Sequence, residues 1–222
     1  MMKPGLSNLS GYLVASGLGL VLVAARLGVT RQFHFLFLPW NLFLAWLPLG
    51  FAWLTRRLAF GAPEHRWGAW LAGLAWLLFL PNSHYIFTDF VHLTGSRGKL
   101  APPLWFDLVM TLLFALTGLL VGLRSVALMH GLVQDLRGPR AGWLFVAGSL
   151  LLSGFGVYLG RFLRWNSWDL FSSPMLLLGD VADRVINPLS DVRGYAFSLL
   201  FGTMLFLVYA MARGVTRPPD RG

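Results

Sequence analysis

The feature that most constrains this chain is a series of apolar runs separated by short segments in which charged residues gather. An α-helix rises 1.5 Å per residue, so crossing a hydrocarbon core about 30 Å thick takes roughly 20 residues. Five runs approach or exceed that length: Leu9–Ala25, Phe35–Leu54, Pro102–Leu123, Ala141–Leu163 and Tyr195–Ala212. Only 12% of the residues are charged, against about 25% in soluble domains, so the runs predict membrane spans.

A further run, between the second and third of these, is irregular. Trp67–Leu80 covers 14 residues, about 21 Å of helix, which is too short for a crossing. A polar segment from Pro81 to His84 follows, and the apolar stretch then resumes as far as Leu93. One interpretation is a kinked helix that continues to about Leu93, with its freed backbone groups buried in protein or lining a wet cavity. The alternative is a helix that ends at Pro81.

The fold expected from these runs is an all-α, polytopic transmembrane helical bundle of about six spans, with a kinked third helix. We expect one transmembrane domain over residues 1–222, in which the basic, proline-containing residues 213–222 form a flexible tail. Two pairs of glycines at four-residue spacing, Gly118/Gly122 and Gly156/Gly160, favour close packing of the fourth and fifth spans. With 25 glycines in the chain, such pairs also arise by chance.

Between spans five and six, Pro174–Asn187 has the pattern of a short helix lying on the membrane surface. Ser172 or Ser173 can cap it, Pro174 suits a first helical turn, and Pro188 stops it. Its apolar and polar residues are interleaved at helical spacing: Met175, Leu176, Leu178, Val181, Val185 and Ile186 against Asp180, Asp183 and Arg184. This composition predicts an amphipathic interfacial helix rather than another span.

Composition excludes several kinds of chemistry. The chain has no cysteine, which removes disulfides, thiolate metal sites and cysteine nucleophiles. No Ser-His-Asp order, glycine-rich phosphate loop or redox motif is present, so we expect no cofactor. The net charge of +9 comes mostly from arginines scattered through short loops, which suits membrane lipids as partners and argues against nucleic acid. The sequence names no protein partner.

The distribution of Lys and Arg predicts the orientation. With six spans, both termini lie on one side, and that side holds ten basic residues against eight on the other. The positive-inside rule therefore places both termini in the cytoplasm. The same parity brings most polar candidates to the extracytoplasmic face, where we expect convergence of Asn41, Asp89, His92, Asp107, Arg161 and Asn166. Polar groups at membrane depth are costly and tend to mark functional sites.

An ordered set of motifs carries a family resemblance. The set comprises Trp40–Pro48, Leu80–Leu93, Trp105 with Asp107, and Gly160–Asp169. Together these motifs resemble the bacterial membrane-protein family catalogued as domain of unknown function 1361, from about the second span to the sixth. The resemblance implies a multi-pass protein of the bacterial inner membrane and supplies no reaction.

Four residues are candidates for catalytic or metal chemistry: His84, Asp89, His92 and Asp107. Asp89 and His92 are three residues apart and would share a helix face, as a carboxylate-oriented histidine does. His84 lies eight residues before His92, about 12 Å along a straight helix, so both cannot bind one metal without a break. The pattern predicts no metal site, and hydrogen bonding at the membrane interface is the alternative role of all four. Whether the chain is an enzyme stays open.

Six residues are candidates for ligand binding: Asn41, Asn82, Arg161, Arg164, Asn166 and Asp169. Arg161 and Arg164 share the exit end of span five, where cations complement the helix dipole and reach toward headgroups. Forked guanidinium groups there can also recognise the phosphate of a lipid headgroup or lipid-linked molecule. A third possibility is pairing of either arginine with a carboxylate of the cluster, Asp89 or Asp107 foremost. Asn41 can instead simply join helices by hydrogen bonding.

Three classes of function remain from the sequence. The one-sided polar cluster favours a membrane protein that binds or acts on a lipid headgroup or small extracytoplasmic molecule. A scaffold subunit of a membrane complex would use the same residues as structural ion pairs. A transporter ranks third because, apart from Thr111 and Thr117, the spans carry few polar residues toward the opposite face.

Overall fold

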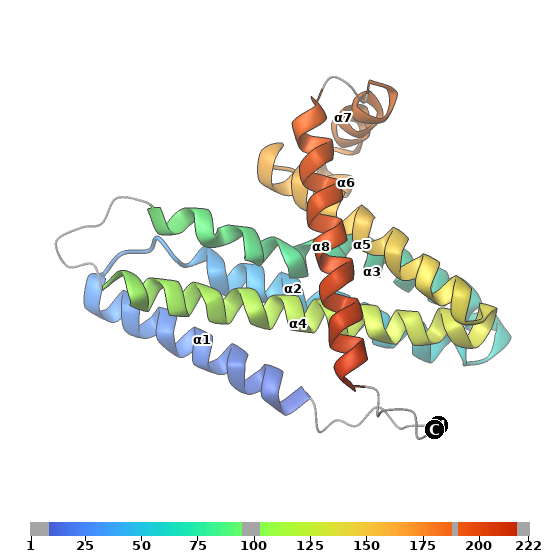
Figure 1. Cartoon of the computed structure of the whole chain (residues 1–222), viewed down its shortest axis with the longest axis horizontal. Coiled ribbons are helices and arrows are strands. Elements are labelled where there is room, and N and C mark those ends of the chain that lie inside the picture. Colours follow the sequence, from blue (N-terminus) through green and yellow to red (C-terminus); the bar gives the residue numbers. More distant parts are fainter. Residues whose placement is uncertain (1–8, 95–102, 188–190, 217–222) are drawn as a thin grey trace. The chain divides into compact units, whose positions relative to one another are not determined.

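The computed structural model describes residues 9–94, 103–187 and 191–216, and every regular element in them is helical (Figure 1). This confirms the expected all-α fold. The long helices are α1 (Leu9–Thr30), α2 (Phe37–Ala59), α3 (Arg66–Tyr85), α4 (Leu104–Arg137), α5 (Pro139–Phe162) and α8 (Val192–Thr216). The short ones are η2 (Pro63–His65), η3 (Ile86–Thr94), α6 (Asp169–Ser172) and α7 (Pro174–Ile186). The chain divides into two compact units, residues 1–125 and residues 126–222.

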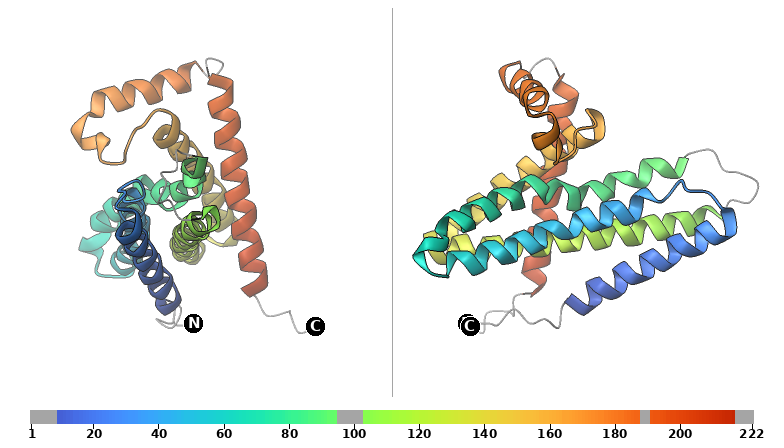
Figure 2. Two further views of the ribbon diagram at one scale, coloured as in Figure 1. Left: turned by 90° about the vertical axis from the view of Figure 1, so that its left-hand side faces the viewer. Right: turned by 180° about the vertical axis from the view of Figure 1, so that it is seen from behind.

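Five of the described helices, α1, α2, α4, α5 and α8, are long and apolar enough to cross a membrane. The chain is therefore a multi-pass membrane protein. The remaining long helix, α3, has 20 residues, and its hydropathy is lowered by the polar residues near its end. It packs lengthwise and antiparallel against α2, which is itself one of the five (Figures 1 and 2).

The third helix runs through Pro81 instead of ending there. Proline inside a helix removes one backbone hydrogen bond and bends the axis, and α3 nevertheless continues to Tyr85. Side chains then bond to carbonyls three residues back: Ser83 Oγ to Leu80 O at 2.7 Å and Thr88 Oγ1 to Tyr85 O at 2.7 Å. Beyond Tyr85 the chain tightens into η3 as far as Thr94, close to the end predicted for a kinked helix.

The core of the first unit lies where α1, α2, η3 and α4 meet. Helix α1 packs antiparallel to α4, and Gly19 leaves room there for the ring of Phe114. Gly118 and Gly122 mark a close approach of α4 to α3, because their neighbours include Ser83 O and His84 Nε2. The four-residue spacing had suggested packing between the fourth and fifth spans. The buried apolar residues of this core are Val23, Phe35, Leu38, Leu42, Ala45, Ile86, Met110, Phe114 and Ala115.

In the second unit, α5 packs against α8 around two glycines. A side chain at Gly154 would meet the backbone of Gly202, which fixes how closely the two helices approach. The short helices α6 and α7 lie between α5 and α8 in the sequence, and α7 precedes α8 (Figure 2). Pro174 opens α7 as predicted, and Ser173 holds its N-cap position without a side-chain capping bond.

Several helices extend beyond the predicted apolar runs. Helix α4 does not end near Arg124 but continues to Arg137, and its 34 residues measure about 51 Å. Helix α8 continues to Thr216, so the first part of the predicted tail is helical, and residues 217–222 lie outside the described residues. Hydropathy marks the membrane-embedded part of a helix, whereas backbone hydrogen bonds carry the helix on into polar sequence. The single domain over 1–222 stays a prediction.

Candidate functional site

Asn41 and Asp89, two of the six residues predicted to converge, are joined by a hydrogen bond. Asn41 lies in the second turn of α2, and its Nδ2 donates to Asp89 Oδ2 at 3.0 Å. Asp89 lies in η3 and is only 1% exposed. A carboxylate buried this deeply needs a hydrogen-bond donor to offset its desolvation, and Asn41 supplies one.

His84 is fully buried in the contact between α3 and α4. Its Nε2 would lie 3.0 Å from a Cβ placed at Gly122, and Ser83 faces Gly118 through its carbonyl. This location gives His84 a packing role in the described structure, and the predicted catalytic role stays a prediction. Asn82, half-buried, donates from Nδ2 to Phe79 O at 3.2 Å, within its own helix.

The carboxylate of Asp107 pairs with Arg26, a partner that the sequence analysis did not name. Arg26 Nε lies 2.7 Å from Asp107 Oδ1 and Nη2 lies 3.4 Å from Oδ2, while Phe35 covers the guanidinium with Cζ 4.3 Å from its ring centroid. The two side chains are 5% and 4% exposed. Arg161 and Arg164 lie in the other unit, so their predicted pairing with Asp89 or Asp107 stays a prediction. Arg26 was missed because a charge near the end of a span ordinarily points toward headgroups.

Of the catalytic candidates, His92 is the one whose side chain the structure does not describe. His92 lies three residues after Asp89 in η3, one turn of a 3₁₀ helix, but its side chain is outside the described residues. Among the described residues, no three His, Asp or Glu side chains gather as metal ligands would. Arg161 and Asn166 belong to the second unit, so their convergence with Asn41, Asp89 and Asp107 stays a prediction.

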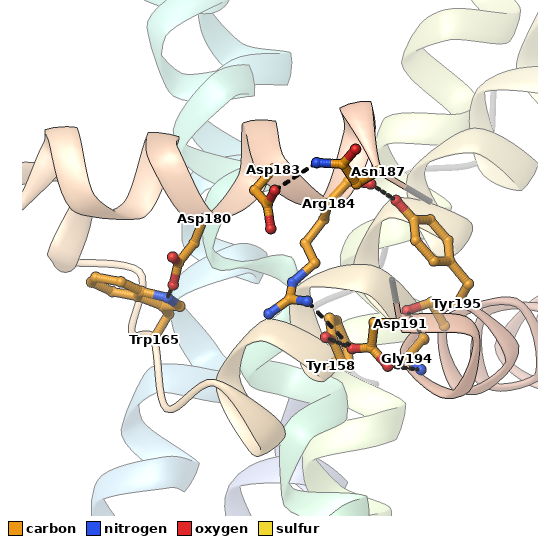
Figure 3. A network of polar contacts seen from close by, with 10 residues as sticks. Tyr158, Trp165, Asp180, Asp183, Arg184, Asn187, Asp191, Gly194 and Tyr195 are labelled. Atoms are coloured by element: carbon orange, nitrogen blue, oxygen red, sulfur yellow. Dashed lines mark hydrogen bonds and ion pairs between the residues drawn. The ribbon is translucent and has the colours of Figure 1, made fainter. Parts of the chain in front are cut away.

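In the second unit, a polar network joins the end of α5, α7 and the start of α8 (Figure 3). Tyr158 donates its hydroxyl to Asp191 Oδ2, and Arg184 of α7 lies 3.9 Å from the same oxygen. The donor Tyr158 lowers the pKa of Asp191, with a further bond from the Gly194 N–H at 3.0 Å. Tyr195 Oη donates to Arg184 O at 2.6 Å, which fixes the last turn of α7 against α8.

The middle of α7 is bonded to the loop that follows α5. Trp165 Nε1 donates to Asp180 Oδ2 at 2.8 Å. In the same loop, the Asn166 N–H donates to Asp169 Oδ2 at 2.6 Å and Ser172 Oγ donates to Asp169 Oδ1 at 3.0 Å. These bonds, the backbone one first, lower the pKa of Asp169. Asn166 and Asp169, both predicted as ligand-binding residues, thus contact one another in a local turn.

Arg161 and Arg164, at the end of α5 and just after it, differ in exposure and in backbone conformation. Arg161 is half-buried in the last helical turn. Arg164 is exposed and has φ of 62°, a left-handed conformation that costs a non-glycine residue about 1–2 kcal/mol. The Leu159 carbonyl accepts both the Leu163 and the Trp165 N–H at 3.2 Å, which closes the chain around Arg164. No carboxylate of the described residues lies within 4.0 Å of its guanidinium.

A second polar cluster, missed by the sequence analysis, lies in the last turns of α4 and α8. His130 Nδ1 accepts from Arg213 Nη1 at 2.6 Å and contacts Tyr209 Oη at 2.8 Å. His130 and Tyr209 are buried, and Arg213 Nη2 also donates to Gln134 Oε1 at 3.4 Å. Along α4, His130 is about 35 Å from Asp107. Toward that end of the spans, the sequence analysis had named only Thr111 and Thr117 as polar residues. A lone histidine inside an apolar run was the available signal.

Comparison with known families identifies the chain. The model of the family described as "Protein of unknown function (DUF1361)" matches residues 40–208, about three quarters of the sequence. The chain belongs to this family. The matched range includes Asn41, Asp89, Asp107 and Arg164, but begins after Arg26. No curated protein and no solved structure matches the chain.

Proposed function

We propose that this DUF1361 member is a protein of the bacterial inner membrane that binds a phosphate-bearing lipid headgroup, or a lipid-linked molecule, at the extracytoplasmic ends of α5 and α8. The family match and the five apolar helices support a membrane location. The excess of Lys and Arg on the side of both termini, ten against eight, supports cytoplasmic termini.

The observation that carries the binding proposal is the state of Arg164. The carboxylates of α6, of α7 and at the start of α8 all have hydrogen-bond donors: Asp169, Asp180, Asp183 and Asp191. Arg164 is exposed, with no carboxylate of the described residues in ion-pair range. A planar guanidinium of this kind binds phosphate oxygens through two parallel N–H bonds.

The position of α7 supports a ligand at headgroup depth. Met175, Leu176 and Ile186 are 80%, 68% and 74% exposed, although they are apolar. An amphipathic helix between two spans buries such side chains at the boundary between headgroups and acyl chains. Trp165, the residue next to Arg164, is bonded to α7, which supports a position of the guanidinium near the depth of lipid phosphates.

The test is phosphatidic acid titrated into the detergent-solubilised protein, with the rise in melting temperature as readout. We expect Arg164→Gln to weaken binding by about tenfold or more, because a hydrogen bond to a charged group contributes about 1.5–3 kcal/mol. Arg164→Gly should weaken binding as much while stabilising the fold, because glycine adopts positive φ without strain. Arg140→Gln, an exposed arginine at the other end of α5, is the matched control. Equal binding by all variants would refute the site.

A scaffold role is the second candidate, favoured by the buried pair of Arg26 and Asp107. A pair covered on one face by Phe35 is suited to joining helices rather than to meeting a ligand. The scaffold role is favoured if every Arg164 variant still binds phosphatidic acid and a defined protein partner co-purifies with the chain.

A further inference from the structure

A cavity opens at the beginning of α3, at the α2–α3 end of the first unit. It has a volume of about 350 Å³ and is lined by Arg66, Trp67 and Trp70. The two tryptophans are three residues apart and therefore neighbours on the helix surface. They are 81% and 71% exposed, so the cavity that both residues line is open to the surroundings.

An exposed apolar stripe continues from this cavity along α3. Trp67, Trp70, Leu71 and Leu74 follow the spacing i, i+3, i+4, i+7 of one helix face. Leu71 and Leu74 are 67% and 62% exposed, whereas Ala72, Trp76 and Leu80 on the other face are buried. From Arg66 to Leu74 the stripe measures about 12 Å, close to the thickness of one leaflet's hydrocarbon.

The charge at the head of the stripe is positive. Arg66 is exposed, and no carboxylate of the described residues lies within 4.0 Å of it. Arg57, near the end of α2, does not line the cavity, and its Cζ lies 5.4 Å from the ring centroid of Trp53. Glu64 is the one acidic residue between the end of α2 and the cavity. The cavity therefore combines a cation, two aromatic walls and an adjoining apolar track.

We propose that this cavity is a binding site for one anionic phospholipid. The phosphate is bound by Arg66 between Trp67 and Trp70, and an acyl chain lies along Trp70, Leu71 and Leu74. Scattered interfacial tryptophans and arginines occur on many membrane proteins and need no specific lipid. What distinguishes this place is that cavity, cation and stripe adjoin on a single helix face. The site is separate from Arg164, which lies in the other unit.

The experiment is native mass spectrometry of the full chain in detergent, with dioleoylphosphatidylglycerol or dioleoylphosphatidylcholine added. These lipids share their acyl chains and differ in headgroup charge. We expect phosphatidylglycerol to bind more tightly to the native protein. Arg66→Gln should weaken phosphatidylglycerol binding by about tenfold and leave phosphatidylcholine unchanged. Trp70→Ala should weaken both lipids severalfold, because it removes a wall and the top of the apolar track. Arg57→Gln, with the same charge loss at the same end of the hairpin, should bind as the native protein does.

Several results would overturn the proposal. Equal affinity of the native protein for both lipids would show that no anionic headgroup is recognised. An Arg57→Gln loss as large as that of Arg66→Gln would assign the effect to general surface charge. Glycerophosphoglycerol has the headgroup but no acyl chain. If it competes fully with phosphatidylglycerol, the apolar stripe does not contribute to binding. Lipid-free dimers that disappear in Trp70→Ala would assign this face to a second copy of the chain.

Discussion

At the scale of single residues, the buried pair of Arg26 and Asp107 shows how the first unit is held together. Arg26 lies near the C-terminal end of α1 and Asp107 in the first turn of α4, where each charge complements its helix dipole. Arg26 Nη1 is buried and has no hydrogen-bond partner among the described residues. The pair is thus desolvated and only partly satisfied, so its members depend strongly on one another.

We predict that Asp107→Leu and Arg26→Leu each destabilise the protein by about 3–5 kcal/mol, because each leaves a buried partner without its counterpart. The double variant Arg26→Leu/Asp107→Leu should recover much of that loss. Stability is measured by equilibrium unfolding in mixed detergent micelles, with the exposed Glu64→Gln as control. Additive losses in the double variant would show that the two side chains act independently.

At the scale of elements, the close approach of α3 to α4 depends on glycine. A methyl group at Gly122 would meet the side chains of Ser83 and His84, both fully buried. Ser83 is also fixed by its own bond to Leu80 O, so it cannot easily turn aside. Ser83 and His84 lie in the last turn of α3, just before the chain tightens into η3.

We predict that Gly122→Ala destabilises the protein by about 1–3 kcal/mol, the usual cost of overpacking a filled core. Gly148→Ala in α5 is the matched control, because nothing lies within 4 Å of a Cβ there. It should be neutral or stabilising by about 0.5–1 kcal/mol, since alanine has the better helix propensity. The same unfolding measurement serves both variants, and equal effects would mean that α3 and α4 adjust without cost.

At the scale of the whole molecule, the number of crossings depends on α3. If α3 crosses the membrane alongside α2, the turn after α2 and the junction between α4 and α5 lie on the same side. If α3 and η3 instead enter the membrane and return to the side they came from, the turn after α2 and the α4–α5 junction lie on opposite sides. The antiparallel packing of α3 along α2 favours the first arrangement.

The chain has no cysteine, so single cysteines report topology directly. We predict that Gly61→Cys and Arg140→Cys are shielded from a membrane-impermeant maleimide in intact cells, while Ser172→Cys is labelled. All three positions are exposed, and labelling of permeabilised cells controls for reactivity. Labelling at Arg140 but not Gly61 would mean that α3 does not cross. Labelling at Gly61 and Arg140 but not Ser172 would reverse the orientation.

The sequence by itself determined the helices and their membrane class, because hydropathy and helix-forming pattern are local properties. It also placed Asn41 and Asp89 at the same depth, and the structure joins these two by a hydrogen bond. Depth in a span is readable from position along the chain, and this made the prediction possible. The ends of α4 and α8 were misjudged because hydropathy does not mark where backbone hydrogen bonding stops.

Only the tertiary structure decided which side chains at similar depth meet. Asp107 pairs with Arg26, and His130 meets Tyr209 and Arg213 across 79 and 83 residues of chain. These partners follow from how each helix is rotated about its axis and which neighbour it packs against, and neither is encoded in spacing along one segment. The same holds for Gly122, whose missing side chain makes room for a residue some 40 positions earlier, because helix packing is a property of two surfaces together.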